Sequence, residues 1–457
     1  MPVFDPEFIA RVASGNWTRV PASSLTGFGI DSRGLRPGDV FVAIKTATRD
    51  GHAYLAAAEA AGAAAALVAS PDSSLELPQL VVADPLSAFQ AIAAAHRRTF
   101  TGPVIGISGS AGKTSTKNLL ALLLADSPGS VLATEGNLNN HLGVPLTLTR
   151  LDPAIHRAAV VEAGIGGPGE MAPLAAMIAP DLSIITLVAA AHLEALGSLC
   201  GVAREKCVLP AATRVGGLKV FPVSCLAHAP FKELPEPVSV VAPEISQSRV
   251  ATVIRLAPRA GVAPLEFTCR RVSEGMARNA ALAIAAAMHL GVSASALQAR
   301  LLTWQPATLR GELRSDSAGR WLYVDCYNAN PASMLDALAV FIDLAPAAEP
   351  RLYVIGGMEE LGAESARYHR ELGAALASRL RAVDRALVVA APSSTAAVLA
   401  GAAGSTNITA SDLEGVRAQF DAFTGAVFMK GSRRYQLESI LVPAGEPAAA
   451  HSPCSVI

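Results

Sequence analysis

The chain has 457 residues, with 37 lysines and arginines against 38 aspartates and glutamates and a formal net charge of -1. At about 150 residues per domain, this length indicates roughly three domains with separate cores, which excludes a peptide or a small regulatory module. The balanced charge provides no electrostatic footprint for nucleic acid or for an anionic membrane surface. An anionic ligand must therefore be bound by a few individual charged or hydrogen-bonding groups at its site, because the surface as a whole is not positively charged.

Hydrophobic residues make up 51% of the chain but aromatic residues only 5%, a composition typical of alanine-rich helices in a helix-rich protein. The longest apolar stretches, residues 60–69 and 182–193, are shorter than the ~20 residues of a membrane-spanning helix. The first residues, MPVFDPEFIARV, lack the layout of a signal peptide, and the six cysteines form no CxxC pair. We therefore expect a cytoplasmic protein with reduced thiols and no membrane partner.

The first hundred residues alternate apolar runs with a helical pattern. Strands are predicted at 40–44, 65–69 and 80–83, and an alanine-rich helix at 54–62. This alternation is typical of an α/β unit, and we assign it to a domain of residues 1–98.

A second α/β unit, residues 99–305, begins with the buried strand PVIGIS, and the runs 158–161 and 182–188 read as parallel strands of the same sheet. Residues 209–267 are rich in proline connectors and predict loops and β-type hairpins. A strong helix follows from Met276 and ends at Gly291.

A third α/β unit is predicted for residues 306–440. Its expected strands are 321–324, 352–355, 385–390 and 426–429. The Pro/Ala-rich residues 441–457 are expected to be a disordered tail.

The sharpest local motif is GSAGKT, residues 109–114, between a predicted strand and a predicted helix. Backbone N–H groups of such a turn cradle phosphate, the lysine pairs with terminal phosphate oxygens, and the threonine hydroxyl can ligate Mg²⁺. The full pattern has glycine where this chain has Ile107. A glycine-rich turn with a surface lysine is the alternative.

Three further residues are ambiguous when each is taken singly. Glu162 follows an apolar strand, where α/β sheets place ligands, but it could equally cap a turn or pair with a lysine. His192 could be a metal ligand or a hydrogen-bonded structural residue, and Lys206 could be catalytic or simply solvated on its helix.

The order of the motifs resolves these ambiguities. The chain reads GISGSAGKTSTK, TEGNLNNHLGVPLTL, VVEAGIGGPGEM, AAAHLEALGSLCGVAREK, ARNAALA, DCYNANPASM, GGMEELGAES and KGSRR, and begins with DSRGLRPGDVFVAI. In this order the motifs resemble those of the Mur ligases over nearly the whole chain. YNANP, HLE and KGSR are most similar to the branch that adds D-alanyl-D-alanine to a UDP-N-acetylmuramoyl-tripeptide.

The resemblance implies three domains: a UDP-sugar-binding domain, a central P-loop ATPase-type parallel sheet, and a Rossmann-like C-terminal domain. It also implies an ATP-dependent, ADP-forming peptide ligase of cytoplasmic peptidoglycan precursor synthesis, acting as a monomer with two Mg²⁺ ions. The tripeptide carboxylate attacks the γ-phosphate of ATP, and the amine of D-alanyl-D-alanine then displaces phosphate from the acyl phosphate.

The resemblance also assigns residues. Lys113, His192 and Lys206 would be catalytic, with a carbamate on Lys206, and Thr114, Glu162 and His192 would be metal ligands. The ATP site would comprise Ser108, Gly109, Ser110, Ala111, Gly112, Lys113, Thr114, Ser115, Asn279, Arg310, Asp325 and Asn328. The other substrates would be bound by Ser32, Arg33, Asn137, Asn139, Asn140, Tyr327, Asn330 and Lys430, with His369, Ser432 and Arg433 as further matches to motifs facing the dipeptide. An asparagine-rich turn at 137–140 and structural roles in the third domain are the alternatives.

The chain departs from the family pattern on the substrate side. Gly164-Ile165-Gly166-Gly167 stands where the family has Gly-Ala-Asn-His, Gly275 replaces a histidine, Gly357 an aspartate, and Lys45-Thr46 a Lys-Gly pair. Two other functions therefore stay open: a related amide ligase, such as a folylpolyglutamate-type enzyme, with another amine acceptor, and a catalytically weak nucleotide-binding partner of wall synthesis. Retention of Lys113, Glu162, His192 and Lys206 together opposes the second.

Overall fold

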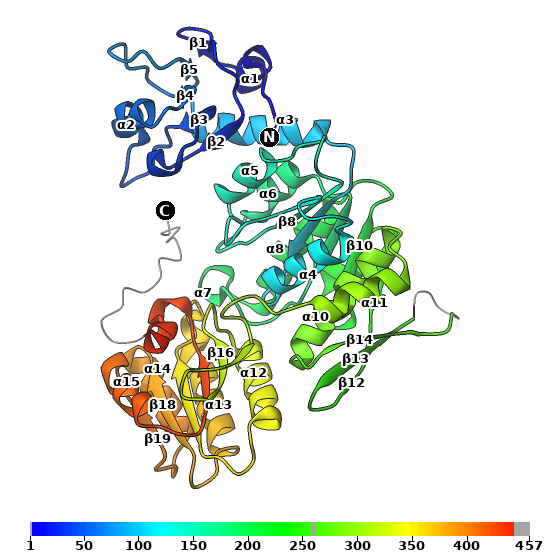
Figure 1. Cartoon of the computed structure of the whole chain (residues 1–457), viewed down its shortest axis with the longest axis vertical. Coiled ribbons are helices and arrows are strands. Elements are labelled where there is room, and N and C mark those ends of the chain that lie inside the picture. Colours follow the sequence, from blue (N-terminus) through cyan, green and yellow to red (C-terminus); the bar gives the residue numbers. More distant parts are fainter. Residues whose placement is uncertain (1, 258–261, 443–457) are drawn as a thin grey trace.

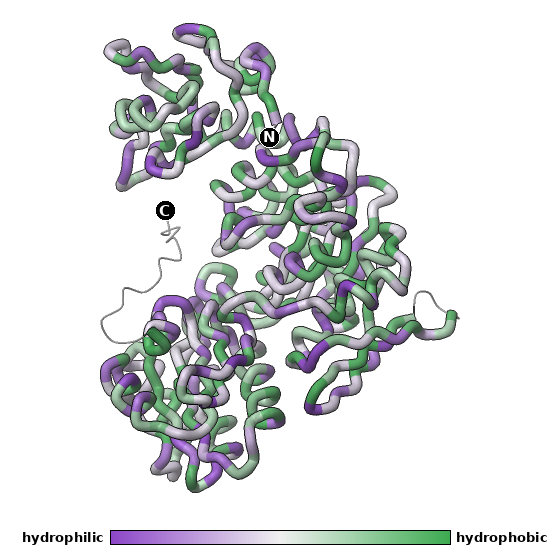
Figure 2. The backbone as a smooth tube through the Cα atoms, viewed as in Figure 1, coloured by the Kyte–Doolittle hydropathy of each residue, from purple (hydrophilic) through white to green (hydrophobic). Residues whose placement is uncertain are grey.

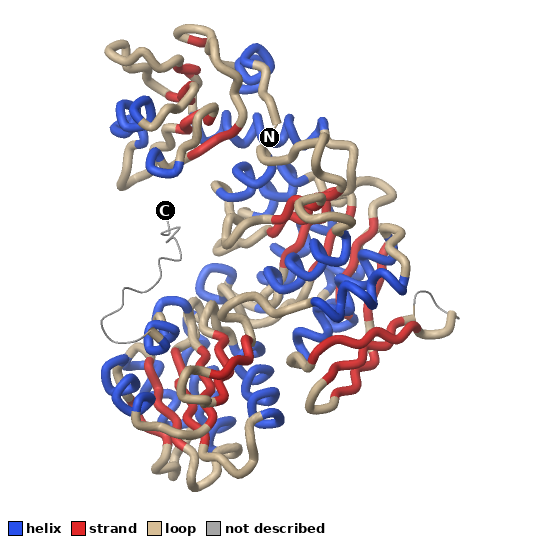
Figure 3. Tube along the Cα trace, viewed as in Figure 1, coloured by secondary structure: helices blue, strands red, loops and turns tan. Residues whose placement is uncertain are grey.

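The computed structural model describes residues 2–257 and 262–442. In Figure 1 they form three parts in a row, with the N-terminal part (blue) at one end, the C-terminal part (yellow to red) at the other, and the central part between them. Within the described residues the strands form four sheets, and helices flank the larger ones (Figure 3). The predicted α/β class is confirmed.

The N-terminal part contains a five-stranded sheet in the order β1-β5-β4-β3-β2, parallel except for the β1–β5 pair. The elements are α1 (Pro6–Ala13), β1 (Asn16–Trp17), β2 (Gly27–Gly29), β3 (Asp39–Val42), α2 (Leu55–Ala60), β4 (Ala65–Val68), β5 (Gln79–Val81) and α3 (Pro85–Thr99). The strands predicted at 40–44, 65–69 and 80–83 are confirmed as β3, β4 and β5. The two edge strands, of two and three residues, are too short for a periodic signal.

Helix α3 joins the N-terminal part to the central part. Phe89 and Ile92 pack in the N-terminal core, whereas Ala93 belongs to the core of the central part. At its end, the fully buried Arg97 donates to the carbonyl oxygens of Ile178 and Ala179, both at 2.9 Å. Its Nη2 also pairs with the Asp181 carboxylate at 2.7 Å, so one side chain ties the helix to the central part.

Replacing Arg97 with methionine is expected to lower the free energy of unfolding by about 3 kcal/mol, because buried carbonyl groups lose their donor. The neighbouring exposed Arg98→Met is the matched control and should change it by no more than about 0.5 kcal/mol. Urea unfolding followed by circular dichroism measures both. Coincident unfolding curves for the two variants would contradict the anchoring role.

The central part is built on a six-stranded, all-parallel sheet in the order β11-β10-β9-β6-β8-β7. Its strands are β6 (Val104–Ser108), β7 (Val131–Ala133), β8 (Ala158–Glu162), β9 (Leu182–Ile185), β10 (Leu218–Pro222) and β11 (Val238–Val241). Its helices are α4 (Lys113–Leu124), α5 (Gly143–Leu148), α6 (Met171–Ile178), α7 (Leu193–Leu196), α8 (Leu199–Ala211) and α9 (Ala229–Lys232). The three middle strands are wholly buried, as a parallel sheet covered on both faces requires.

The prediction for residues 209–267 is wrong in part. Strands β10 and β11 extend the parallel sheet, whereas loops and hairpins were expected. A five-residue run does not reveal a partner strand that is distant in sequence. The hairpins themselves are confirmed as the antiparallel sheet β12 (Glu244–Gln247), β13 (Ala251–Leu256) and β14 (Leu265–Arg270). Helices α10 (Glu274–His289), which confirms the helix predicted from Met276, and α11 (Ala294–Thr303) close this core.

The C-terminal part contains a six-stranded sheet in the order β15-β16-β20-β17-β18-β19, in which only the edge strand β15 is antiparallel. The strands are β15 (Glu312–Ser315), β16 (Trp321–Asp325), β17 (Arg351–Gly356), β18 (Arg385–Val389), β19 (Ile408–Ala410) and β20 (Ala426–Lys430). The helices are α12 (Pro331–Leu344), α13 (Ser365–Ala377), α14 (Pro392–Gly401) and α15 (Leu413–Asp421). All four predicted strands are confirmed, as β16, β17, β18 and β20.

Apolar and polar residues alternate in short runs along all three parts (Figure 2). Of the helices in the described residues, none combines the length and the apolar character needed to cross a bilayer. Of the predicted tail, residues 443–457 lie outside the described residues.

Candidate functional site

A cavity of about 1360 Å³ lies where the central and C-terminal parts meet. The carboxyl ends of two parallel sheets contribute to its wall: Glu162 ends β8 on one side, and Asp325 and Lys430 end β16 and β20 on the other. Ligands of α/β sheets bind beyond such strand ends. This cavity is therefore the candidate active site.

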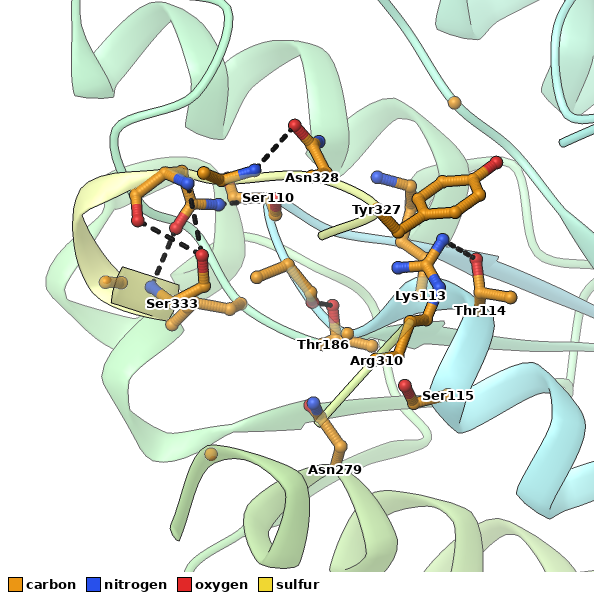
Figure 4. A pocket seen from close by; sticks show the side chains of 18 of the residues that line it. Ser110, Lys113, Thr114, Ser115, Thr186, Asn279, Arg310, Tyr327, Asn328 and Ser333 are labelled. Atoms are coloured by element: carbon orange, nitrogen blue, oxygen red, sulfur yellow. Dashed lines mark hydrogen bonds between the residues drawn. The ribbon is translucent and has the colours of Figure 1, made fainter. Parts of the chain in front are cut away.

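The glycine-rich loop between β6 and α4 forms the floor of the site, with Ser110, Lys113, Thr114 and Ser115 visible in Figure 4. Gly112 has a φ of 80°, and a Cβ there would lie 2.0 Å from the side-chain nitrogen of Asn279. Glycine is thus required both by the backbone and by the close approach of α10. Position 107, where the sequence pattern departs, is a buried residue within β6 paired with Glu162, so the phosphate-facing turn begins only after it.

A chain of hydrogen bonds joins the loop to the end of β8. The Thr114 hydroxyl donates to Glu162 Oε2 at 2.9 Å, and Asn139 donates to Glu162 Oε1 at 2.8 Å. Lys113 Nζ donates to the Gly109 carbonyl at 2.9 Å. Burial lowers the pKa of Lys113, and the negative charge of Glu162 opposes that shift.

Arg310 reaches this network from the segment preceding β15. Its guanidinium donates to the Thr114 hydroxyl at 3.0 Å and lies 3.9 Å from the centre of the Tyr327 ring. Figure 4 shows the guanidinium between these two side chains. The aromatic face stabilises the cation and fixes its planar fork beside the glycine-rich loop. The structure places Arg310, a residue that the resemblance assigned to the ATP site, in the cavity wall.

The C-terminal wall is held together by a buried lysine. Lys430 Nζ pairs with Asp325 at 2.6 Å and donates to the Asn328 carbonyl at 3.2 Å. Asn330 caps α12 and donates to the Ser110 carbonyl at 3.1 Å, which bridges the C-terminal part and the glycine-rich loop. The YNANP motif therefore both starts a helix and contacts the glycine-rich loop.

His192 precedes α7 in the left-handed region, at a φ of 55°, and its side chain lines the cavity. Its Nδ1 atom contacts the carboxylate of Glu360, which comes from the loop after β17. This contact lowers the pKa of the Glu360 carboxyl, although burial acts in the opposite direction.

Lys206 lies on α8 and is fully buried, and it is not among the residues that line the cavity. Its Nζ has no hydrogen-bond partner within the described residues. Burial, together with repulsion from Lys113, lowers its pKa well below the usual value. The solvated surface lysine considered from the sequence is therefore wrong.

The predicted site residues fall into two sets. The cavity is lined by Ser110, Ala111, Gly112, Lys113, Thr114, Ser115, Asn137, Asn139, Asn140, Glu162, His192, Asn279, Arg310, Asp325, Tyr327, Asn328, Asn330, Lys430, Ser432 and Arg433. Outside the lining lie Ser32, Arg33, Ser108, Gly109, Lys206 and His369.

Three residues of the second set have the following surroundings. Arg33 is exposed on the N-terminal part and pairs with Asp31 at 2.6 Å. Ser108 is buried at the end of β6. His369 is buried on α13, where its Nε2 accepts from the Met358 N–H at 3.1 Å, the structural alternative weighed from the sequence.

At two of the sequence departures, an added side chain would meet the end of a neighbouring side chain. A Cβ at Gly275 would lie 2.6 Å from the carboxylate of Asp336, which accepts from the Gly275 N–H at 2.9 Å. A Cβ at Gly357 would lie 2.7 Å from the Tyr435 hydroxyl. At both positions a larger family side chain would therefore displace a neighbour in this chain.

Sequence reasoning missed several cavity residues, among them Thr186, Asp336 and Glu360. Thr186 donates to the Ala111 carbonyl at 2.5 Å and so braces the glycine-rich loop. Glu360 lies in the motif GGMEELG, which pointed to this loop as part of the site. Its contact with His192 could not be predicted, because the two residues are distant in sequence. Asp336 has no local signal because it appears as one more polar position on a helix.

The donor set of the cavity suits Mg²⁺. Thr114 and Glu162 supply hydroxyl and carboxylate oxygens, the hard ligands that Mg²⁺ takes together with substrate phosphates. Within residues 2–257 and 262–442, no three His, Cys, Asp or Glu side chains form a ready-made metal cage. Mg²⁺ does not require one, because it usually retains water and phosphate ligands.

A glycine-rich phosphate loop at the end of a parallel strand, faced by groups from a second parallel sheet, defines a P-loop protein of the multidomain α/β class. Family models described as "Mur ligase middle domain", "Mur ligase, glutamate ligase domain" and "Mur ligase family, catalytic domain" match residues 107–256, 309–428 and 24–97. The chain belongs to the Mur ligase family.

Within the family, the chain is similar to proteins that share one name. The chain is 33% identical to "UDP-N-acetylmuramoyl-tripeptide--D-alanyl-D-alanine ligase" of Escherichia coli, with 80% of this chain and 81% of the relative covered. It is 32% identical to the protein of that name from Synechocystis, at 82% and 81% coverage. The "Crystal structure I of MurF from Acinetobacter baumannii" matches with a TM-score of 0.86 and 27% identity over 96% of this chain and 98% of that one.

Proposed function

We propose that the protein is an ATP-dependent, ADP-forming ligase that joins D-alanyl-D-alanine to UDP-N-acetylmuramoyl-tripeptide through an acyl phosphate. The observation that carries the proposal is one cavity in which the loop of Lys113 and Thr114 meets Arg310 and Asn330 of the C-terminal part. The names of the relatives supply the substrates. Peptidoglycan precursor synthesis in the cytoplasm is the corresponding process.

In this proposal the glycine-rich loop and Lys113 hold the β- and γ-phosphates of ATP, and the positive charge of Lys113 offsets charge that develops on the transferred group. Arg310 lies beside Thr114 and so adds a second cation at the same place. The remaining ATP contacts assigned are Ser108, Gly109, Ser110, Ala111, Gly112, Ser115, Asn279, Asp325 and Asn328.

Thr114 and Glu162 would hold Mg²⁺, which would supply positive charge beside the phosphates, and His192 would serve a second ion. The hydrogen bond from Asn139 already orients the Glu162 carboxylate, as the partner of a metal ligand does. Mg²⁺ would reduce the repulsion between the substrate carboxylate and the γ-phosphate.

Lys206 is proposed to carry a carbamate. Its neutral amine adds CO₂, with formation of an N–C bond and release of one proton, so that an anion replaces a potential cation. The lowered pKa of the buried, unpartnered amine supports this reaction, because only the neutral amine is nucleophilic.

The other substrates would be held on both sides of the cavity. Asn137, Asn139 and Asn140 lie on the central side, whereas Tyr327, Asn330 and Lys430 lie on the C-terminal side. Ser32 and Arg33 would contact the uridine diphosphate. We propose domains of residues 1–98, 99–305 and 306–440 that close around the substrates, because groups needed for one reaction come from different parts.

The test is phosphate release from ATP with UDP-N-acetylmuramoyl-tripeptide and D-alanyl-D-alanine. We expect release that requires all three substrates and Mg²⁺, and ADP in equal amount to the new amide. Release with another amine acceptor but not with D-alanyl-D-alanine would identify a different amide ligase. ATP binding without release for any acceptor would identify a nucleotide-binding partner.

A further inference from the structure

The loop of residues 359–362, after β17, is docked on helix α7 of the central part. The Glu194 N–H donates to the Glu360 carbonyl at 3.2 Å, and a Cβ at Gly362 would lie 2.9 Å from the Glu194 Cα. Glu360 and Gly362 have φ values of 62° and 53°. A left-handed glutamate is uncommon and persists where its surroundings hold it, here the backbone contact with α7.

This docking brings one carboxylate to one imidazole. The Glu360 carboxylate contacts His192 Nδ1. Within the described residues that nitrogen is buried and makes no hydrogen bond, so the Glu360 carboxylate is a charged acceptor beside an unsatisfied ring nitrogen. His192 itself is in a left-handed conformation at the start of α7, so its ring position is set by the same contact surface.

We infer that Glu360 is a positioning residue for His192. Its carboxylate accepts a hydrogen bond from Nδ1–H, and this tautomer leaves the Nε2 lone pair free for a cation in the cavity. The inference rests on the proposed function, in which His192 serves Mg²⁺. A histidine ligand usually donates its other ring N–H to a carboxylate, which sets the tautomer and the ring orientation.

The two residues lie in loops that follow strands of different sheets. Glu360 follows the C-terminal strand β17, whereas His192 follows the central strand β9. The imidazole is therefore held in its ligand orientation only while the two parts are in contact. Completion of the cation site is thus coupled to the placement of the C-terminal part.

The first test is spectroscopic and needs neither metal nor activity. Side-chain ¹⁵N NMR of histidine-labelled full-length protein at pH 8, with His192→Gln to assign the signal, reports which ring nitrogen carries the hydrogen. We expect the Nδ1–H tautomer in the unaltered protein and a shift toward Nε2–H in Glu360→Gln. An Nε2–H or doubly protonated His192 in the unaltered protein would overturn the inference.

The second test is a double-mutant cycle on Mg²⁺-dependent phosphate release. Glu360→Gln should raise the Mg²⁺ concentration needed for half-maximal release about 10- to 100-fold, and should add no further loss in a His192→Ala background. An equal loss in both backgrounds would show that Glu360 acts independently of His192 and would refute the assignment. Glu360→Asp, whose carboxylate is one methylene shorter, should resemble Glu360→Gln.

Glu364→Gln is the matched control. Glu364 follows the same loop, its side chain is 45% exposed, and it pairs with Arg367 and does not line the cavity. It should leave both the tautomer and the Mg²⁺ requirement unchanged. The NMR measurement uses no substrate, so the two proposals can fail separately. An inactive protein with the Nδ1–H tautomer would contradict only the proposed function. An active ligase with the Nε2–H tautomer would contradict only this inference.

Discussion

Replacing Lys206 with methionine is expected to abolish phosphate release, by at least about 10³-fold, while the fold becomes no less stable. Methionine removes the amine that the carbamate requires. It also removes a buried Nζ without a partner, a group that costs about 1–3 kcal/mol when left unsatisfied. Phosphate release and thermal unfolding of the same preparation measure the two effects.

Lys219→Met provides the matched control for Lys206. Lys219 is also buried in the central part, but its Nζ donates to the Gly217 carbonyl at 3.2 Å and it lies outside the cavity lining. This variant should retain turnover and lose about 1 kcal/mol of stability, the opposite pattern.

A short carboxylic acid should partly restore release to Lys206→Ala, because it can take the place of the carbamate anion. Unimpaired turnover in Lys206→Met would refute the carbamate. Loss of activity together with loss of the folded state would instead indicate a structural role for the lysine.

Replacing Lys113 with methionine is expected to lower kcat about 10²- to 10³-fold, the usual effect of removing one group that stabilises transition-state charge. Lys113 is the cation of the glycine-rich loop, and its Nζ donates a hydrogen bond to the Gly109 carbonyl of the same loop. Because phosphates carry charge before as well as during transfer, ATP binding should also weaken, by about tenfold.

Steady-state phosphate release and calorimetric titration with ATP and Mg²⁺ separate these two effects. Lys232→Met, at the exposed end of α9, should leave both at the level of the unaltered protein. Lys206→Met should bind ATP normally yet fail to release phosphate. This comparison separates ATP binding by the glycine-rich loop from the chemical steps that follow binding. Normal kcat in Lys113→Met would exclude the assigned role of the loop.

Local signals in the sequence were sufficient for most of the fold. The buried strand before Gly109 and the helix after Lys113 were recognised because a continuous apolar run and a glycine turn leave a local pattern. β10 and β11 escaped recognition because a short run reveals neither its partner nor its direction.

The site divides in the same way. Sequence order alone named Lys113, Glu162 and Lys430, because each stands in a motif whose residues are close in the chain. It could not show that Lys206 is buried without a partner, because burial depends on how α8 packs against the sheet. Nor could it choose between the structural and functional readings of His369.

By itself, the sequence determined the α/β class, the glycine-rich turn between strand and helix, and the family, because strand, turn and helix patterns and ordered motifs are local properties of the chain. Only the tertiary structure decided which groups act together. Arg310 meets Thr114 across 196 residues, and Glu360 meets His192 from another sheet. The physical reason is that hydrogen bonds and ion pairs act over a few ångströms of space, whatever the distance along the chain.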